Sequence, residues 1–369
     1  MLVGYKRESS DAAGRWIRVS SKVSSKCFTS VRGSFGIISR ASDHMINQQR
    51  DVSIDVLRIL CCLMVIAIHA TPEYESYITL GAARADEIKV LLVQAFVRGG
   101  LPIFFMISGM YILNSEQESL HAFYKKRLLR IIVPFLVFGG LHFFILGYRD
   151  PNANLLSLTW GFLSGLNSPS ALGPHFWFVY SIIGLYLISP LVSLFLKSID
   201  SSMVWKIILG LLVIKAYNLY SIGGVTGIAI PDIDVWLLYF LIGGLLVRIK
   251  PPPILLSLAI LLASWMVTCL VAYIQAHALI GLNLRPFDCG LNMYAFSMSA
   301  CLIFLSLQIK LPSLMEKIVT FVSKGTYGIF LIHVLVLFEL GARINFQPYK
   351  DNIIIYSIMI SGVVFVVSF

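Results

Sequence analysis

Apolar stretches of nearly membrane-spanning length follow one another along the chain from Val52 to its last residue. A helix rises about 1.5 Å per residue and needs about 20 apolar residues to cross the hydrocarbon core of a bilayer. Strands of a membrane barrel instead alternate apolar and polar residues in segments of about ten. The sequence therefore predicts an all-α fold, a polytopic transmembrane helical bundle of about ten helices. The predicted helices cover residues 52–70, 90–113, 128–147, 176–196, 203–221, 235–249, 254–274, 291–309, 325–342 and 353–369.

Two further features concern the longest connection and the end of the chain. Residues 148–175 contain LLSLTWGFLSGL, which we expect to form a short helix at the membrane interface. The tenth apolar segment runs into Phe369 without a polar flank, so we expect this last helix to be truncated. We find no evident internal repeat, which counts against many secondary transporters, whose halves often repeat.

The composition supports the membrane assignment. Of the 369 residues, 57% are hydrophobic and only 13% are charged, whereas soluble proteins carry about 25% charged residues. Residues 1–50 hold nine Lys and Arg against three Asp and Glu, a net charge of +6 out of +10 for the whole chain. We interpret this bias as a membrane-topology signal rather than a nucleic-acid surface, and we predict no nucleic-acid partner.

The chain divides into a tail, residues 1–50, and a membrane domain, residues 51–369. The tail is basic and Ser-rich and lacks the apolar core of a secretory signal, so we expect a disordered cytoplasmic tail. A transit peptide and a start at Met45 are the alternatives. In the membrane domain, Lys and Arg gather in the even-numbered connections, as at Lys125 and Lys310. By the positive-inside rule, these connections and the N-terminus face the cytoplasm.

Two ionisable residues, Arg58 and His69, lie eleven positions apart in the first predicted helix, VSIDVLRILCCLMVIAIHA. Eleven residues turn a helix about 20° past three full turns and rise about 16 Å, so both side chains share one face at different depths. Ionisable groups inside a bilayer are costly and usually functional. A neutral imidazole can take a proton from a hydroxyl near neutral pH, so we predict that His69 is a general base.

Arg58 is predicted to bind an anion, because a guanidinium stays charged and holds phosphate through two hydrogen bonds. A buried ion pair with Asp55, one turn earlier, is the alternative. Arg127 and Arg130 share a face at the start of the third helix, on the same cytoplasmic side as Arg58. We predict that the three arginines form a basic mouth for a polyphosphate, with a plain role as membrane anchors as the alternative for the pair.

Aromatic and imidazole side chains gather on the opposite, outer side. His175 and Trp177 open the fourth helix and are predicted to bind a substrate, with an interfacial aromatic belt as the alternative. Glu73 is a further candidate substrate contact. It follows His69 by four residues and would orient the imidazole if the helix continued, although an intervening proline disfavours this. His333, inside the ninth helix, is either a packed structural histidine or a site residue.

Small residues in the second helix, VRGGLPIFFMISGMYI, permit close approach of a neighbouring helix. We interpret Gly99, Gly100 and Gly109 as packing against the first helix. The six cysteines are scattered without metal-ligand spacing, so we predict packing roles and no metal site. The sequence also lacks the motifs of serine hydrolases, zinc proteases, P-loop proteins and dinucleotide-binding proteins.

Five segments, in order, resemble the acyltransferase-3 family of integral membrane O-acyltransferases. Arg58 and His69 match the first-helix signature of the family, within DVLRILCCLMVIAIHA. GGLPIFFMISGMYI is similar to the second helix, RLLRIIVPF carries the paired arginines of the third, and HFWFVYSIIGLYLISP and YGIFLIH resemble two later segments. The resemblance covers residues 45–369 and is strongest to bacterial surface-polysaccharide O-acetyltransferases of the enterobacterial common antigen type.

The resemblance implies that an acyl group, usually acetyl, moves from cytoplasmic acyl-CoA to a hydroxyl of a surface or lipid-linked polysaccharide in the bacterial inner membrane. Acyl-CoA is then the donor substrate, no cofactor is tightly bound, and the partners are the glycan and membrane lipids. Arg58, Arg127 and Arg130 would hold the donor phosphates, and His69 would activate the acceptor hydroxyl, with an acyl-histidine relay as an alternative. A transporter or flippase of a lipid-linked sugar, or a scaffolding subunit, is the alternative from another functional class.

Overall fold

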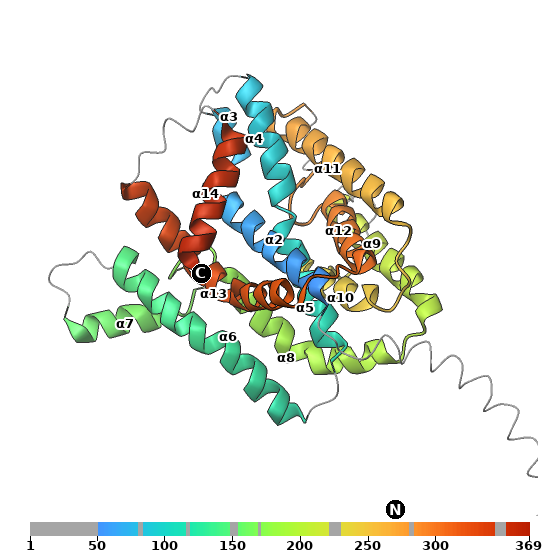
Figure 1. The fold of residues 1–369 in the computed structure, drawn as a ribbon, viewed down its shortest axis with the longest axis horizontal. Helices are drawn as coiled ribbons and strands as arrows, with labels where there is room; N and C mark the ends of the chain where they lie inside the picture. The colour runs from blue at the N-terminus through green and yellow to red at the C-terminus, as the bar shows by residue number, and fades with distance from the viewer. Residues whose placement is uncertain are drawn as a thin grey trace, which may run out of the picture. The chain divides into compact units, whose positions relative to one another are not determined.

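The computed structural model describes residues 51–79, 84–115, 119–147, 154–168, 171–220, 230–279, 284–343 and 352–369. The tail, residues 1–50, and the expectation that it is disordered lie outside these residues. The described chain is all-α and contains no strand (Figure 1). Its helices are α2 (Val52–Ala70), α3 (Tyr74–Thr79), α4 (Arg84–Val97), α5 (Gly100–Leu113), α6 (Leu120–His142), a π-helical turn (Phe143–Gly147), α7 (Leu155–Gly165), α8 (Trp177–Lys197), a short 3-10 turn (Ser201–Met203), α9 (Val204–Tyr220), α10 (Val235–Leu246), α11 (Ile254–Ala276), α12 (Leu291–Leu307), α13 (Ser313–Arg343) and α14 (Ile353–Ser368).

Each of the ten predicted apolar segments overlaps a helix among the described residues. Within the described residues, seven helical segments are long and apolar enough to cross a membrane. The helices α10, α12 and α14 have only 12, 17 and 16 residues, so a count of ten spans stays a prediction. The expected short helix in the third connection is present as α7, and its N-cap Asn154 accepts a hydrogen bond from the Ser157 amide at 2.8 Å.

Several predicted helices have different ends in the structure; α6, for example, begins at Leu120, before the predicted start at residue 128. The second predicted helix is two helices, α4 and α5, separated at Arg98 and Gly99. The consecutive glycines Gly99 and Gly100 weaken a continuous helix there, because glycine is a poor helix former. The helix α13 begins at Ser313, well before the predicted start. Its first turns carry charged residues such as Glu316, which an apolarity criterion excludes.

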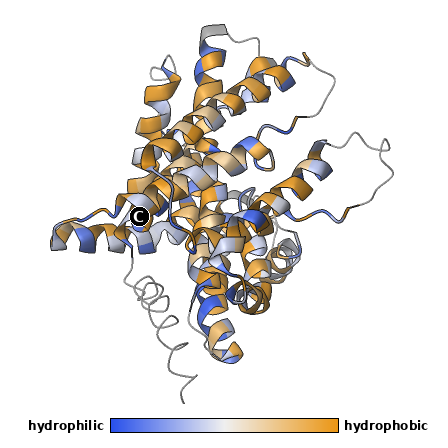
Figure 2. Ribbon diagram, turned by 90° about the vertical axis from the view of Figure 1, so that its right-hand side faces the viewer, coloured by the Kyte–Doolittle hydropathy of each residue, from blue (hydrophilic) through white to orange (hydrophobic). Residues whose placement is uncertain are grey.

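Much of the helical ribbon is coloured as hydrophobic in Figure 2, and several helices carry large apolar side chains that are exposed. Soluble proteins rarely expose large continuous apolar surfaces, whereas a helix surrounded by lipid must present them. Exposed large side chains occur on α6, α8, α9, α11 and α14. Examples are Val137, Leu191, Leu209, Leu255 and Ile358.

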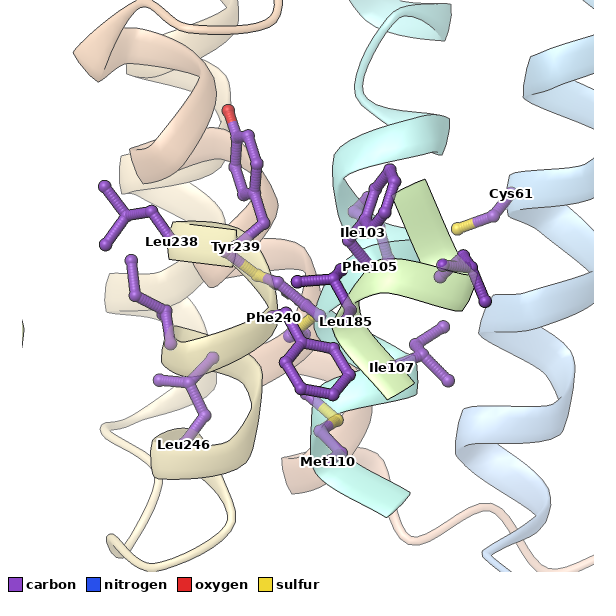
Figure 3. Close-up of a cluster of buried hydrophobic side chains, with 14 of the residues drawn as sticks. Cys61, Ile103, Phe105, Ile107, Met110, Leu185, Leu238, Tyr239, Phe240 and Leu246 are labelled. Carbon is purple, nitrogen blue, oxygen red and sulfur yellow. Dashed lines mark hydrogen bonds between the residues drawn. The ribbon is translucent and has the colours of Figure 1, made fainter. Parts of the chain in front are cut away.

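The helix α5 lies at the centre of the main core and packs against α2, α8, α10 and α12. Figure 3 shows its buried side chains between α10 and α2, with Phe105 and Ile107 among them. Gly100 packs against α2 as predicted, because a Cβ there would lie 2.7 Å from Met64 Cβ. Gly109 contacts the Phe240 carbonyl of α10 instead of α2. The small residues of this segment therefore serve more than one neighbour.

We expect Gly109→Val to destabilise the fold, because the added side chain would collide with the Phe240 carbonyl, a main-chain atom that cannot move aside. Overpacking typically costs about 1–3 kcal/mol, and a main-chain collision belongs at or above that range. Thermal unfolding of the purified protein in detergent measures the effect. A matched control is Gly210→Ala on α9, where a Cβ meets no atom within 4 Å. Equal melting temperatures for the two variants would contradict the α5–α10 packing.

Candidate active site

The first cluster lies where α2 packs against α13, near the N-terminal end of α2. The Asp55 carboxylate is fully buried. It lies 3.8 Å from the Arg58 guanidinium and accepts a hydrogen bond of 2.7 Å from the Ser323 hydroxyl. Arg58 also donates to the Ser323 hydroxyl at 3.5 Å. The Asp55–Arg58 pair weighed in the sequence analysis is therefore present, and it holds the guanidinium in place.

The ion pair with Asp55 leaves the Arg58 side chain partly accessible. About a quarter (24%) of its side chain is exposed, and the guanidinium lies 5.3 Å from the centre of the Tyr111 ring on α5. Tyr186 on α8 lies within electrostatic range of both Arg58 and Arg127. Arg127 stacks over Phe123 of its own helix at 4.3 Å. Two of the three predicted phosphate ligands thus lie within electrostatic range of the same tyrosine.

Arg130, the third predicted ligand, is exposed on α6, about one turn beyond Arg127. The helix that carries both is tied to α13, because the Tyr327 hydroxyl donates to the Ile131 carbonyl at 3.0 Å. The structure thus places cationic side chains of α2 and α6 on elements that both contact α13.

The second cluster surrounds a pocket of about 430 Å³ at the C-terminal end of α2. His69 lines this pocket and is exposed to it. His69 and Arg58 therefore lie on one continuous helix, and each contacts α13, through His333 and Ser323 respectively. The pocket is lined by Val65, Ile68, His69, Glu73, Arg98, Leu101, His175, Trp177, Phe178, Asp288 and Phe330.

Four histidine rings, from four separate parts of the described chain, form a row in space beside this pocket. The ring centres of His69 and His333 are 5.3 Å apart, those of His333 and His175 are 5.0 Å apart, and those of His175 and His142 are 5.2 Å apart. The last three rings are at most 2% exposed. Burial lowers the pKa of His175 to about 3 and the nearby His142 adds to this effect, so His175 is neutral at physiological pH.

Each of the three buried rings uses one nitrogen to bond a main-chain carbonyl. His175 Nε2 lies 3.1 Å from the Leu331 oxygen, His333 Nδ1 lies 2.6 Å from the Phe330 oxygen, and His142 Nδ1 lies 2.9 Å from the Phe138 oxygen. A carbonyl only accepts, so these nitrogens carry the hydrogens, and the other nitrogen of each neutral ring carries a lone pair. Those three nitrogens are buried without a hydrogen-bond partner in the described chain.

The rim of the pocket carries an arginine between acidic groups. Arg98 donates to a Glu73 carboxylate oxygen at 3.1 Å and to the Gln94 amide oxygen at 3.3 Å. Its guanidinium also stacks over the Phe287 ring at 4.6 Å. Asp288, next in the chain, lines the pocket, and burial raises the pKa of its carboxyl, while the charge of Arg98 opposes this shift.

The predicted substrate contacts His175, Trp177 and Glu73 all line the pocket with His69. Glu73 does not continue the helix of His69, as the intervening proline indicated, because α2 ends at Ala70 and the next residue is extended. The Thr71 hydroxyl caps this end by donating to the Ala67 carbonyl at 2.6 Å. The proline that follows has no amide hydrogen and disfavours helix before it. Glu73 therefore reaches the pocket from the loop and bonds Arg98 instead.

Three residues of this region were not predicted from the sequence: Arg98, Asp288 and His142. Arg98 adjoins the packing glycines of the second segment, and the local sequence does not distinguish a residue of the pocket from a residue of a helix contact. Asp288 lies in a connection with no recognisable motif. The signal for His142 was present, because a histidine at the end of an apolar helix needs a partner in a membrane.

Comparison with known proteins agrees with these observations. A family model described as an acyltransferase domain matches residues 51–369. No curated protein matches the chain, and no solved structure matches it. The match covers all of the described helices, including the seven segments able to cross a membrane. The chain therefore belongs to the acyltransferase-3 family and is a multi-pass membrane acyltransferase.

Proposed function

We propose that this acyltransferase moves an acyl group, most simply acetyl, from acyl-CoA to a hydroxyl of a surface or lipid-linked polysaccharide. One observation carries the proposal: a histidine facing a pocket and a half-buried arginine lie on one helix, about 16 Å apart along its axis. We place the protein in a bacterial inner membrane with its N-terminus in the cytoplasm. The proposal includes a polysaccharide acceptor of the enterobacterial common antigen type.

The donor enters, in this proposal, at the Arg58 end. Arginine suits phosphate because its planar fork gives two parallel hydrogen bonds and keeps its charge. Arg58 and Arg127 lie within electrostatic range of the same tyrosine, and Arg130 lies about a turn further along α6 as an exposed cation. Together they would bind the phosphates of acyl-CoA. The pantetheine arm would extend along α2, and its length is of the same order as the 16 Å rise to His69.

The acceptor occupies the pocket at the His69 end. Ligand pockets combine apolar and aromatic walls with a few polar groups that fix orientation. Trp177 and Phe178 supply aromatic surface here, while His175 and Glu73 supply polar atoms. A sugar, with an apolar ring face and hydroxyl groups on its rim, matches that combination.

The chemistry is a single acyl transfer. His69 takes the proton of an acceptor hydroxyl, and the oxygen attacks the thioester carbonyl. The carbon–sulfur bond breaks, and the thiolate of CoA receives the proton from His69, so the products are an ester and CoA. Attack by His69 itself, with an acyl-histidine intermediate, gives the same products in two steps.

We expect His69→Ala to abolish most of the transfer, because a positioned general base contributes about 10²–10⁴-fold in rate. The measurement is transfer of label from acetyl-CoA to glycan in membranes containing the variant. The control is His121→Ala, which removes an exposed histidine on α6 and should leave the rate unchanged. Full acetylation of the glycan by His69→Ala would remove His69 from the mechanism.

We expect Arg127→Ala to raise the KM for acyl-CoA by about 10–100-fold, because hydrogen bonds to a charged group contribute about 1.5–3 kcal/mol and each 1.4 kcal/mol is tenfold. Arg58→Ala should act in the same direction, but it also deprives the buried Asp55 carboxylate of its cation. Its melting temperature is therefore measured alongside. The control is Lys125→Ala, an exposed cation near the start of α6. A donor dependence equal to wild type in Arg127→Ala would exclude it from the donor site.

The same labelling assay separates this proposal from the transporter alternative. Movement of a lipid-linked sugar across the membrane without label on glycan would favour a flippase. Label on glycan that requires His69 would favour the acyltransferase. Mass spectrometry of the product identifies the acyl group and the modified hydroxyl.

A further inference from the structure

The three buried histidines beside the pocket share an unusual property. Their N–H groups all bond main-chain carbonyls, so each ring presents a lone pair on its other nitrogen. An acceptor atom buried without a donor is costly. Among the described residues these atoms are His142 Nε2, His175 Nδ1 and His333 Nε2. Such an arrangement requires donors that arrive from elsewhere.

His175 lines the pocket, although its Nδ1 is itself buried. His333 is further from the pocket. It is fully buried and is not among the residues that line the pocket. A neighbouring side chain that carries an N–H group could therefore act as the donor to His333 Nε2.

The neighbouring rings leave one candidate donor. His175, 5.0 Å away between ring centres, has committed its hydrogen to the Leu331 carbonyl. His69, 5.3 Å away, is the exposed ring of the group, and it can rotate toward His333 because its other side faces the pocket. Among these rings, the N–H of His69 is therefore the candidate donor, and a small rotation of His69 would bring it to the buried lone pair.

We propose that His333 is the positioning residue of the catalytic base: its Nε2 accepts the N–H of His69 and thereby fixes which nitrogen of His69 faces the acceptor hydroxyl. The inference rests on the proposed function of His69. A ring nitrogen that donates to a fixed acceptor leaves the opposite nitrogen with the lone pair, which is the form a base needs. When His69 holds the proton of the acceptor hydroxyl, the same contact stabilises the imidazolium until the thiolate receives that proton.

A neutral partner suits this position better than a carboxylate would. In soluble enzymes a buried Asp often orients the histidine, but an additional ionised carboxylate within a membrane domain is costly. The titratable or charged groups around His69 come from several elements and include both cationic and acidic side chains. They are Arg98, Glu73, Asp288, His175, His333 and, packed against the same end of α2, Tyr356 of α14.

The test compares His333→Phe, which keeps a flat ring without an acceptor, with His333→Gln, whose amide oxygen can accept the same hydrogen. We expect kcat to fall at least about 10-fold in the Phe variant. This loss is smaller than the rate enhancement of about 10²–10⁴-fold that a general base supplies. The KM for acyl-CoA should stay unchanged, since the Arg58 end is untouched. The Gln variant should recover most of the lost rate. Equal loss in both variants would indicate a packing role and overturn the proposal.

The pH profile provides a readout that a packing role would not move. A hydrogen bond to the charged form of a group favours that form, so without the acceptor His69 should become protonated only at lower pH. The acidic limb of kcat should therefore shift to lower pH in His333→Phe and stay near wild type in His333→Gln. An unshifted limb in His333→Phe would overturn the proposal.

A chemical readout separates this proposal from the proposed function. Diethyl pyrocarbonate modifies neutral imidazole, and mass spectrometry measures the modification of His69 against pH, with the exposed His121 as an internal reference. A shift in the pH midpoint of His69 modification in His333→Phe would support the contact between the two histidines. If the wild-type protein at the same time transferred no acyl group, the proposed function would be wrong while the contact remained supported. If the Phe variant does not fold, nitrogen-15 NMR of the wild type in bilayers should show coupling between the two rings, and its absence would overturn the contact.

Discussion

The packing of α2 against α13 is the contact on which the candidate site depends. The Asp55 carboxylate is fully buried between them, and the Ser323 hydroxyl donates to it at 2.7 Å. An unpaired carboxylate in such surroundings is strongly destabilising, so this bond restricts how the two helices can slide past each other. The same register brings His333 beside His69 further along the pair. The contact between Asp55 and Ser323 thereby helps to set the positions of His69 and His333.

The sequence predicted the part of the site that depends on local periodicity. Arg58 and His69 belong to one uninterrupted helix, and helical geometry alone puts residues eleven apart on one face. The histidines that surround His69 could not be placed by local periodicity. His142, His175 and His333 come from the end of α6, the loop before α8 and the middle of α13. Their meeting depends on the packing of helices far apart in the chain, which local patterns do not encode.

Helix ends also limited what the sequence could predict. Apolarity located the middle of each helix but not its charged or glycine-rich ends, as the early start of α13 and the break at Gly99 illustrate. The end of α2 mattered most for the site. Because α2 stops at Ala70, Glu73 leaves the helix and bonds Arg98, which neutralises the cation at the pocket. The proline that follows α2 predicted the break, but its consequence for Arg98 required the fold.

The two clusters differ in charge, and this difference bears on the proposed positions of donor and acceptor. At the Arg58 end, Arg127 is a further cation within range of the same tyrosine, Tyr186. At the His69 end, the cation Arg98 is paired with Glu73, and Asp288 lies beside it. Arg58 and Arg98 each have a carboxylate partner, so the further cation Arg127 is what distinguishes the first cluster. This difference is the reason why the proposed function assigns the anionic donor to the Arg58 end and the uncharged hydroxyl to the His69 end.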